Sequence, residues 1–466
     1  MNLKIKILFF VLLWPLFFLG QGWTQFGLDI DGEAVEDRSG HAVAINGDGT
    51  IVAIGALSND DNGINSGHVR VYQYIFGVWL QLGQDIDGEG IDDGSGSSVS
   101  LSNDGFILAI GAPYNSDNGV DAGHVRVYQY GFSSGLWTQI GQDLDGELAG
   151  DEFGRSVSLN YDGSILAIGG PNNSGNGNAS GHVRVYEYNG QWNQIGLDID
   201  GEAADDLSGY SVCLSGDGSI VAISAKENDG SALDAGHVRV YENSAGNWVQ
   251  TGQDIDGEAS GDDFGREVSL NDNGNILAVG ASGNDDAGFN AGHARVYENI
   301  LGTWTQIGQD LDGEATNDYF GKSVSLNSTG TILAVGGYMN DGNNQTTSNK
   351  GHTRVFNNVG GNWFQIGQDI DGEAANNYSG AAVCLSNSGE KVVIGAPFNA
   401  DNGTASGHVR IFENTSVPAS IPNIDFTNSS DFRIVDILFR EVNESNNKVL
   451  FYIHDNGRVD KKIILE

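Results

Sequence analysis

The chain has 466 residues, and its 62 Asp and Glu against 22 Lys and Arg give a formal net charge of −40 at pH 7. This charge excludes nucleic acid and anionic membranes as electrostatic partners, because both repel a negative surface. With 69 Gly, 6 Pro and no Gly-X-Y period, the composition excludes collagen and indicates many tight turns, and only two Cys exclude a disulfide framework.

Residues 1–22 predict a secretory signal peptide. Lys4 and Lys6 precede an apolar run from Ile7 to Leu19, and Gly20-Gln21-Gly22 has the small-x-small pattern of a cleavage site. A retained membrane anchor is the alternative, but this run is shorter than the roughly 20 apolar residues that cross a bilayer. We therefore expect cleavage near Trp23, a secreted or cell-surface location, and no membrane span in the mature chain.

From Trp23 onward one phrase, Trp-x-Gln-x-Gly-x-Asp, occurs seven times at intervals of 55 to 59 residues. Such a fixed period is the signature of a repeat architecture, whose units must stack to bury their apolar faces. The phrase begins at Trp23, Trp79, Trp137, Trp192, Trp248, Trp304 and Trp363.

Each repeat contains four strand-length runs separated by Gly-, Asn- and Asp-rich turns. In the second repeat the predicted strands cover residues 98–102, 107–112, 124–130 and 137–142. A four-stranded antiparallel sheet that is apolar on both faces must pack against copies of itself, and seven copies close into a ring. The sequence therefore predicts an all-β, seven-bladed β-propeller over residues 23–414.

The ends of the repeat region predict how the ring closes. The mature chain starts with a fourth-strand sequence at Trp23, whereas the seventh repeat stops after its third strand near Phe412. We expect the N-terminal strand to complete the last blade, because this removes the two open sheet edges.

Short motifs at the strand ends resemble FG-GAP repeats of the integrin α-chain type over residues 23–413. They are Phe-Gly at Phe153, Phe264 and Phe320 and Gly-Ala-Pro at Gly111 and Gly395, while four repeats have Ser-Gly at Ser39, Ser95, Ser208 and Ser379. The resemblance implies a propeller with a calcium loop between the first two strands of a repeat. Here that loop shrinks to turns such as 46–49 and 327–330, which offer too few oxygens, so we expect that site to be absent.

Acidic residues recur after each fourth strand as Asp-[Ile/Leu]-Asp-Gly-Glu-x-x-x-[Asp/Asn], here named the acid motif. Strand alternation and a flexible glycine could bring its carboxylates together, which makes calcium a candidate ligand. The alternative, favoured because all seven repeats share the motif, is that the acids brace turns and form ion pairs. The candidate ligands in the first three motifs are Asp29, Asp31, Glu33, Asp37, Asp85, Asp87, Glu89, Asp93, Asp143, Asp145, Glu147 and Asp151.

Every third strand contains Gly-His-x-Arg, with the His and Arg side chains on one face. Seven identical copies offer neither a nucleophile nor a break in symmetry, so we predict no catalytic role. We expect each Arg to pair with a carboxylate of an acid motif. The loops between strands two and three and between successive blades leave the same face and carry most of the acids, which predicts a strongly negative face.

Departures from the repeat are the candidates for recognition. The sixth repeat has the longest second loop, 338–350, and the fourth replaces Gly-Ala-Pro with Ser-Ala-Lys. Neutral variation of surface loops is the alternative. The candidate ligand-face residues are Tyr338, Met339, Lys350 and Lys226. Cys213 and Cys384 occupy equivalent places in blades that face each other across the ring, so we expect two buried free thiols.

The C-terminal region follows a different pattern. Residues 415–423 predict a linker with two prolines, and 424–466 a small β tail with strand-like runs at 434–442 and from 451 onward. These runs, IVDILFREV and FYIHDNGRVDKKIILE, resemble the C-terminal sorting domain of type IX secretion cargo. The alternative is a small β appendage of the propeller.

These features favour a monomeric, non-catalytic binding or adhesion module for an extracellular glycan, a protein or a cation-bridged surface. No cofactor is implied other than the candidate calcium. Two alternatives stay open: an extracellular polysaccharide-degrading enzyme that uses paired carboxylates, and a purely structural surface component.

Overall fold

The computed structural model describes residues 22–342 and 348–415 and, beyond them, the segments 432–435, 448–454 and 459–464. Contacts divide the chain into two units, Met1–Ser416 and Val417–Glu466. Residues 1–21 of the predicted signal peptide, residues 416–423 of the predicted linker and residues 343–347 of the 338–350 loop fall outside the described residues. Among the described residues every regular element is a β-strand, and none forms a helix long and apolar enough to cross a membrane.

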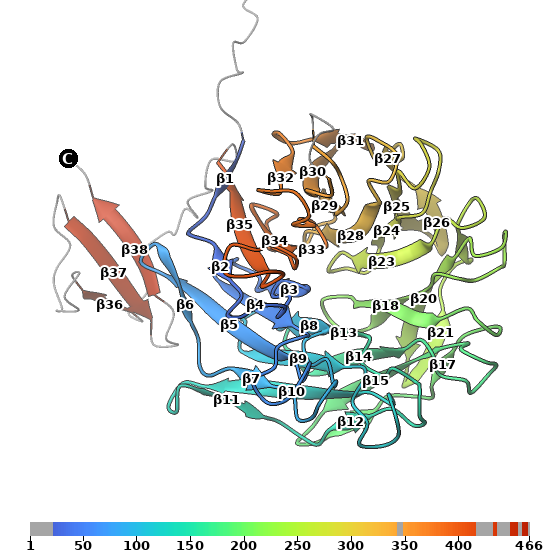
Figure 1. The fold of residues 1–466 in the computed structure, drawn as a ribbon, viewed down its shortest axis with the longest axis horizontal. Helices are drawn as coiled ribbons and strands as arrows, with labels where there is room; N and C mark the ends of the chain where they lie inside the picture. The colour runs from blue at the N-terminus through green and yellow to red at the C-terminus, as the bar shows by residue number, and fades with distance from the viewer. Residues whose placement is uncertain (1–21, 343–347, 416–431, 436–447, 455–458, 465–466) are drawn as a thin grey trace, which may run out of the picture. The chain divides into compact units, whose positions relative to one another are not determined.

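The first unit is a ring of seven antiparallel sheets, which confirms the predicted propeller (Figure 1). Blade 1 contains β3 (Ala42–Ile45), β4 (Ile51–Ala56), β5 (His68–Ile75), β6 (Val78–Gln81) and β7 (Ile86–Asp87). Blade 2 contains β8 (Ser98–Leu101), β9 (Ile107–Ala112), β10 (His124–Gly131), β11 (Leu136–Gln139) and β12 (Leu144–Asp145). Blade 3 contains β13 (Ser156–Leu159), β14 (Ile165–Gly170), β15 (His182–Tyr188), β16 (Trp192–Gln194) and β17 (Ile199–Asp200).

The remaining blades repeat this order. Blade 4 contains β18 (Ser208–Leu214), β19 (Ile220–Ala225), β20 (His237–Ser244), β21 (Asn247–Gln250) and β22 (Ile255–Asp256). Blade 5 contains β23 (Phe264–Leu270), β24 (Ile276–Ala281), β25 (His293–Ile300), β26 (Thr303–Gln306) and β27 (Leu311–Asp312). Blade 6 contains β28 (Phe320–Leu326), β29 (Ile332–Gly337), β30 (His352–Val359), β31 (Asn362–Gln365) and β32 (Ile370–Asp371). Blade 7 contains β33 (Ala382–Leu385), β34 (Lys391–Ala396), β35 (His408–Asn414), β1 (Trp23–Gln25) and β2 (Ile30–Asp31).

The ring closes as the sequence predicts. Strand β1 pairs antiparallel with β35, with Trp23 opposite Asn414 and Gln25 opposite Phe412. The first described strand therefore completes the seventh blade and covers the edge that β35 would otherwise expose.

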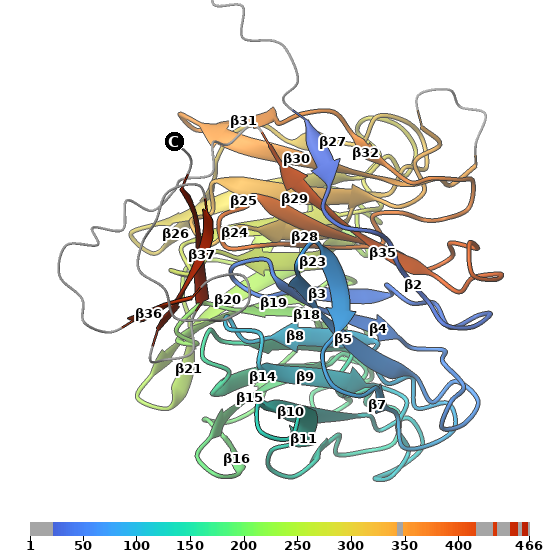
Figure 2. The same cartoon turned by 90° about the vertical axis from the view of Figure 1, so that its left-hand side faces the viewer.

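The core lies between the blades, where neighbouring sheets lie face to face (Figure 2). One apolar cluster joins Ile51 and Val69 of blade 1 to Leu108 and Trp137 of blade 2. Gly55 shows how tight this packing is, since a Cβ there would lie 2.1 Å from the carbonyl oxygen of Gly96 in the next blade. A side chain at position 55 would push the two blades apart.

The repeated Trp phrase holds these junctions together. In each copy the indole Nε1–H donates to a carbonyl oxygen of the preceding blade's outer segment, as Trp137 does to Leu82 at 2.7 Å. The seven bonds span 2.7 to 3.1 Å, so the phrase is a structural contact repeated around the ring.

The acid motif departs from the prediction, because its first part is not a loop. After Gly27, at φ 91°, the chain returns to the sheet and Ile30 pairs with Val409 as part of β2. Ile30 is buried, and this apolar anchor holds the segment as an interrupted continuation of the edge strand. Asp29 and Asp31 flank the anchor.

Two further expectations are corrected. Cys213 and Cys384 are free thiols, as predicted, but they are partly rather than fully buried. The second unit has three strands, β36 (Phe432–Val435), β37 (Lys448–His454) and β38 (Val459–Ile464), in the antiparallel order β36-β37-β38. The second predicted run thus forms parts of two strands. The resemblance of this tail to a sorting domain stays a prediction.

Candidate functional site

The last acid of each motif is committed to a turn. Asp37 is 2 % exposed, and its Oδ2 accepts the backbone N–H of Ala34 at 2.9 Å. Asp151 likewise accepts the N–H of Leu148 and an amide hydrogen of Asn173, both at 3.0 Å. Asp93 makes the equivalent bonds to Gly90 and Asn115. These carboxylates therefore brace the turn.

The second acids, Asp31, Asp87 and Asp145, lie in the two-residue strands β2, β7 and β12. Their backbones pair with the repeated histidines: Asp31 with His408, Asp87 with His68 and Asp145 with His124.

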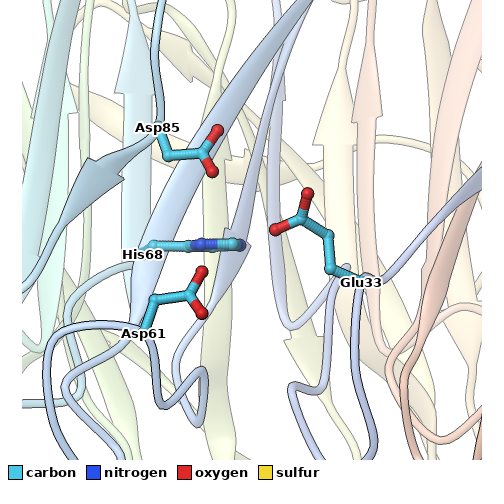
Figure 3. A group of neighbouring side chains, drawn as sticks. All are labelled: Glu33, Asp61, His68 and Asp85. Atoms are coloured by element: carbon cyan, nitrogen blue, oxygen red, sulfur yellow. The ribbon is translucent and has the colours of Figure 1, made fainter.

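The other two acids of a motif go to different blade junctions. Glu33 comes within reach of His68 and of Asp61 and Asp85, each offering one ligand atom within 4.8 Å of the others (Figure 3). Asp29, from the same motif as Glu33, instead joins Glu373 and His408. The structure therefore does not gather one motif around one point; it combines acids of successive motifs around a buried histidine. Other such groups, here named junction clusters, are Glu89-His124-Asp143, Glu147-His182-Asp198 and Glu202-His237-Asp254.

The repeated arginines cross these junctions, which confirms the predicted ion pairs. Arg70 Nη1 lies 3.1 Å from Glu33 Oε1, and its Nη2 donates to the carbonyl oxygen of Asp31 at 2.8 Å. Because Glu33 follows the edge strand of blade 7 while Arg70 lies in blade 1, the pair ties two blades. Arg354 differs, because its ion pair is with Asp369 of its own blade and it reaches the preceding blade through the Asp312 carbonyl oxygen at 2.9 Å. The other pairs that join neighbouring blades are Arg126–Glu89, Arg184–Glu147, Arg239–Glu202, Arg295–Glu258 and Arg410–Glu373.

Burial favours the neutral form of the junction histidines His68 and His124. His68 is 1 % exposed and neither ring nitrogen has a hydrogen-bond partner. Burial lowers its pKa, and the charge of Arg70 lowers it further. Burial likewise lowers the pKa of His124 to about 4. A neutral imidazole beside two or three carboxylates is a donor set that divalent metals accept, although calcium prefers oxygen ligands alone.

A second location lies on the axis of the ring, where the first strand of each blade lines a cavity of about 330 Å³. These strands, β3, β8, β13, β18, β23, β28 and β33, surround the centre in Figure 1. We name this cavity the axial pocket. In contrast to the junctions, the residue that each blade contributes varies. At the position after Phe-Gly or Ser-Gly the cavity is lined by His41, Ser97, Arg155, Tyr210, Arg266, Lys322 and Ala381.

Cations gather on one side of the axial pocket. The Tyr210 ring has the guanidinium carbon of Arg155 4.9 Å from its centroid and that of Arg266 at 5.1 Å. Arg155 Nη2 also donates to the Tyr210 hydroxyl oxygen at 3.0 Å. Burial, and then the charge of Arg266, lowers the pKa of Lys322, whereas burial raises that of Glu267.

Aromatic side chains form a second group in the axial pocket. The ring centroids of Tyr338 and Tyr378 lie 5.9 Å apart, and those of Tyr378 and Phe398 lie 4.9 Å apart. All three residues line the axial pocket, and Tyr319 extends the series from Tyr338 at 5.8 Å. We name these four residues the aromatic arc.

The recognition candidates from the sequence are dispersed. Tyr338 lines the axial pocket, and Lys226 Nζ lies 4.9 Å from the Tyr210 ring centroid. Lys350 pairs with Asp371 at 3.7 Å, while the Met339 backbone N–H donates to the Asp318 carbonyl oxygen at 3.4 Å. Sequence reasoning missed the cations at the equivalent positions Arg155, Arg266 and Lys322. The signal was available, since the residue after Phe-Gly or Ser-Gly varies while its neighbours repeat.

Comparison with known proteins gives one family. Residues 255–297, from β22 through most of β25, match the FG-GAP repeat. No curated protein matches the chain. The propeller of the structure agrees with this family and with the motifs at the strand ends.

Proposed function

We propose that this chain is a non-catalytic binding or adhesion module that holds an extracellular ligand in its axial pocket. The observation that supports this is the change of chemistry on the axis. The Trp and Arg contacts repeat in all seven blades and serve the ring, whereas the axial pocket collects arginine, lysine and aromatic residues that serve no repeated contact. A concave site with aromatic walls and a few polar groups is the usual form of a ligand site.

Display outside the cell is part of the proposal. FG-GAP repeats are typical of extracellular proteins, and residues 1–22 have the pattern of a signal peptide. The tail's resemblance to a sorting domain favours attachment to the surface after export. A ring closed by its own first strand leaves only the short outer strands of the blades as edges, which favours a monomer.

Divalent cations could bridge the acidic face of the propeller to an acidic ligand surface. The junction clusters place carboxylates beside buried imidazoles, and the acidic loops surround them. Calcium or another divalent cation bound there would link this face to an acidic surface.

The experiment is a binding screen of the mature chain against arrays of extracellular glycans and proteins. Ligands that bind the wild type are then measured with Tyr378→Ala, which alters the pocket wall, and with Lys391→Gln. Lys391 lies at the start of β34 and contacts Phe26 and Asp48, so it is a control outside the pocket. Loss of binding in Tyr378→Ala alone supports the proposal. Ligands that bind both variants as well as the wild type would contradict it.

A polysaccharide-cleaving enzyme is the second candidate, favoured by one observation. Glu267, Lys322 and Tyr210 line the axial pocket, and the pKa values of Glu267 and Lys322 move toward each other. Groups with such shifts are used for proton transfer. Incubation with acidic and neutral polysaccharides, followed by measurement of new chain ends, separates the two candidates, because a binding module releases none.

A further inference from the structure

Cations are scarce in this chain, and their placement on the axis is therefore informative. Of 22 Lys and Arg, seven are the arginines of the junctions. Arg155, Arg266 and Lys322 come from three blades to one cavity in a protein with 62 acidic residues. Among the residues lining that cavity, Glu267 is the one carboxylate. Within this lining three cations face one acid, while Glu152 acts on Arg155, and Asp263 on Arg266 and Lys322, from outside it.

One of these cations, Arg266, has an unused hydrogen-bond donor. The Nε of Arg266 is buried and has no hydrogen-bond partner. A buried N–H group without an acceptor destabilises the folded state unless a ligand or water molecule accepts its hydrogen bond. Arg155 and Arg266 also crowd Lys322, since the charge of each lowers its pKa. A bound anion would receive hydrogen bonds and relieve this repulsion.

The aromatic arc indicates that the ligand also has an apolar face. Tyr338, Tyr378 and Phe398 line the same cavity as Tyr210 and its cations. A small inorganic anion would leave these surfaces without a partner. A ring with an apolar face and a charged substituent would use both walls.

We propose that the axial pocket binds an acidic saccharide, with the carboxylate of a uronic acid among Arg155, Arg266 and Lys322 and a sugar ring against the aromatic arc. Arginine suits this role because its planar fork matches a carboxylate. The volume of about 330 Å³ lies at the lower end of the range for ligand sites, which favours the end of a saccharide chain. This inference rests on the proposed function, since it takes the axial pocket as the ligand site.

The test is calorimetric titration of the mature chain with four probes. They are a hexuronic acid disaccharide, its methyl ester, the neutral hexose disaccharide and acetate. We expect the acid to bind at least ~10-fold more tightly than the ester and the neutral sugar, a difference of one charged contact. We expect acetate to bind weakly, because it lacks the ring.

Variants assign each part of the ligand. Arg266→Gln should weaken the acid at least ~10-fold and leave the neutral sugar unchanged, and Arg266→Lys should restore part of the loss. Tyr378→Ala should weaken both sugars and leave acetate unchanged. Lys391→Gln removes the same charge outside the pocket and should change nothing. A thermal melt of each variant verifies that it folds.

The outcomes separate this inference from the proposed function. Equal binding of acid and neutral sugar, lost in Tyr378→Ala but kept in Arg266→Gln, would overturn the acidic ligand and leave the pocket as the binding site. Acetate that binds as tightly as the disaccharide would overturn the saccharide. Failure of the acid to bind, while another ligand binds in a Tyr378-dependent way, would also overturn this inference alone. Ligands indifferent to every pocket variant would overturn both.

Discussion

Closure of the ring depends on Trp23, and replacing it tests the whole architecture. Trp23 is 4 % exposed, and it is the one buried side chain of the three in β1. Its Nε1–H donates to the carbonyl oxygen of Ile366 at 3.0 Å. Loss of a buried Trp side chain costs about 3–5 kcal/mol, which includes the unsatisfied carbonyl.

Trp137→Ala is the matched control. Trp137 is equally buried, and its Nε1–H donates to the Leu82 carbonyl oxygen in the same way. Its strand, β11, however directly follows its pairing partner β10 in the chain, whereas β1 and β35 come from opposite ends of the propeller. Both variants should lose about 3–5 kcal/mol of unfolding free energy, measured by urea denaturation. Only Trp23→Ala should also release β1 from β35, because the other two side chains of β1, Thr24 and Gln25, are exposed.

Hydrogen exchange detected by mass spectrometry measures this release. In Trp23→Ala, peptides covering β1 and β35 should exchange faster than the blade 3 strands, while in Trp137→Ala they should stay protected. Unchanged protection of β35 in Trp23→Ala would refute the closure argument, because the edge of blade 7 would then be held by something else.

Five other changes have defined outcomes. Burial lowers the pKa of His124, His237 and His408 to about 4, so their imidazole NMR signals should titrate near pH 4, and midpoints near 6.5 would contradict neutral junction histidines. Since the unfolded state takes up these protons first, their contribution to stability falls as pH decreases from about 6.5 toward 4. Glu89→Gln should cost under about 1 kcal/mol, because that carboxylate is largely exposed. Arg126→Met should cost about 2–3 kcal/mol, because it leaves the Asp87 carbonyl oxygen without its donor; equal losses in urea denaturation would show that the ion pair alone matters. A chelator should leave the melting temperature unchanged, because Arg70 already balances Glu33 and Asp37 already accepts a backbone N–H, whereas a drop of several degrees would show structural metal. Affinity for the acidic disaccharide should rise between 10 and 150 mM salt, because screening acts first on the repulsion by the net charge of −40, and a steady fall would show that the pocket cations dominate at all distances.

The ring could be predicted from the sequence because its determinants repeat. The Trp spacing, the strand-length runs and the unmatched strands at Trp23 and Phe412 are local patterns, and each has one geometric solution. The ion pairs followed from the same logic, since a repeated cation needs a repeated acid. Partition of the acids between junctions could not be predicted, because it depends on how far each blade is rotated against the next. The anchoring role of Ile30 was also not predicted, since a single apolar residue among acidic residues is typical of a loop.

The axial pocket was missed for a different physical reason. Arg155, Arg266 and Lys322 are separated by 56 residues or more along the chain, although each follows Phe-Gly in a nearly identical local sequence. The repeat marks their equivalent positions, but their meeting in one cavity is a consequence of ring closure.

Repetition and variation also divide the energetics of this fold. Seven indole bonds and seven junction arginines distribute the stability of the ring over many equivalent contacts. The residue after Phe-Gly or Ser-Gly takes part in neither set, and it points into the cavity rather than into a blade junction. Substitution there removes no repeated contact, so its cost should be that of a surface change and not that of a core cavity. A chain built this way can change its axial chemistry from Ala381 to Arg266 without weakening its blades, which is why differences among the seven copies on the axis carry more information about function than the many features that the copies share.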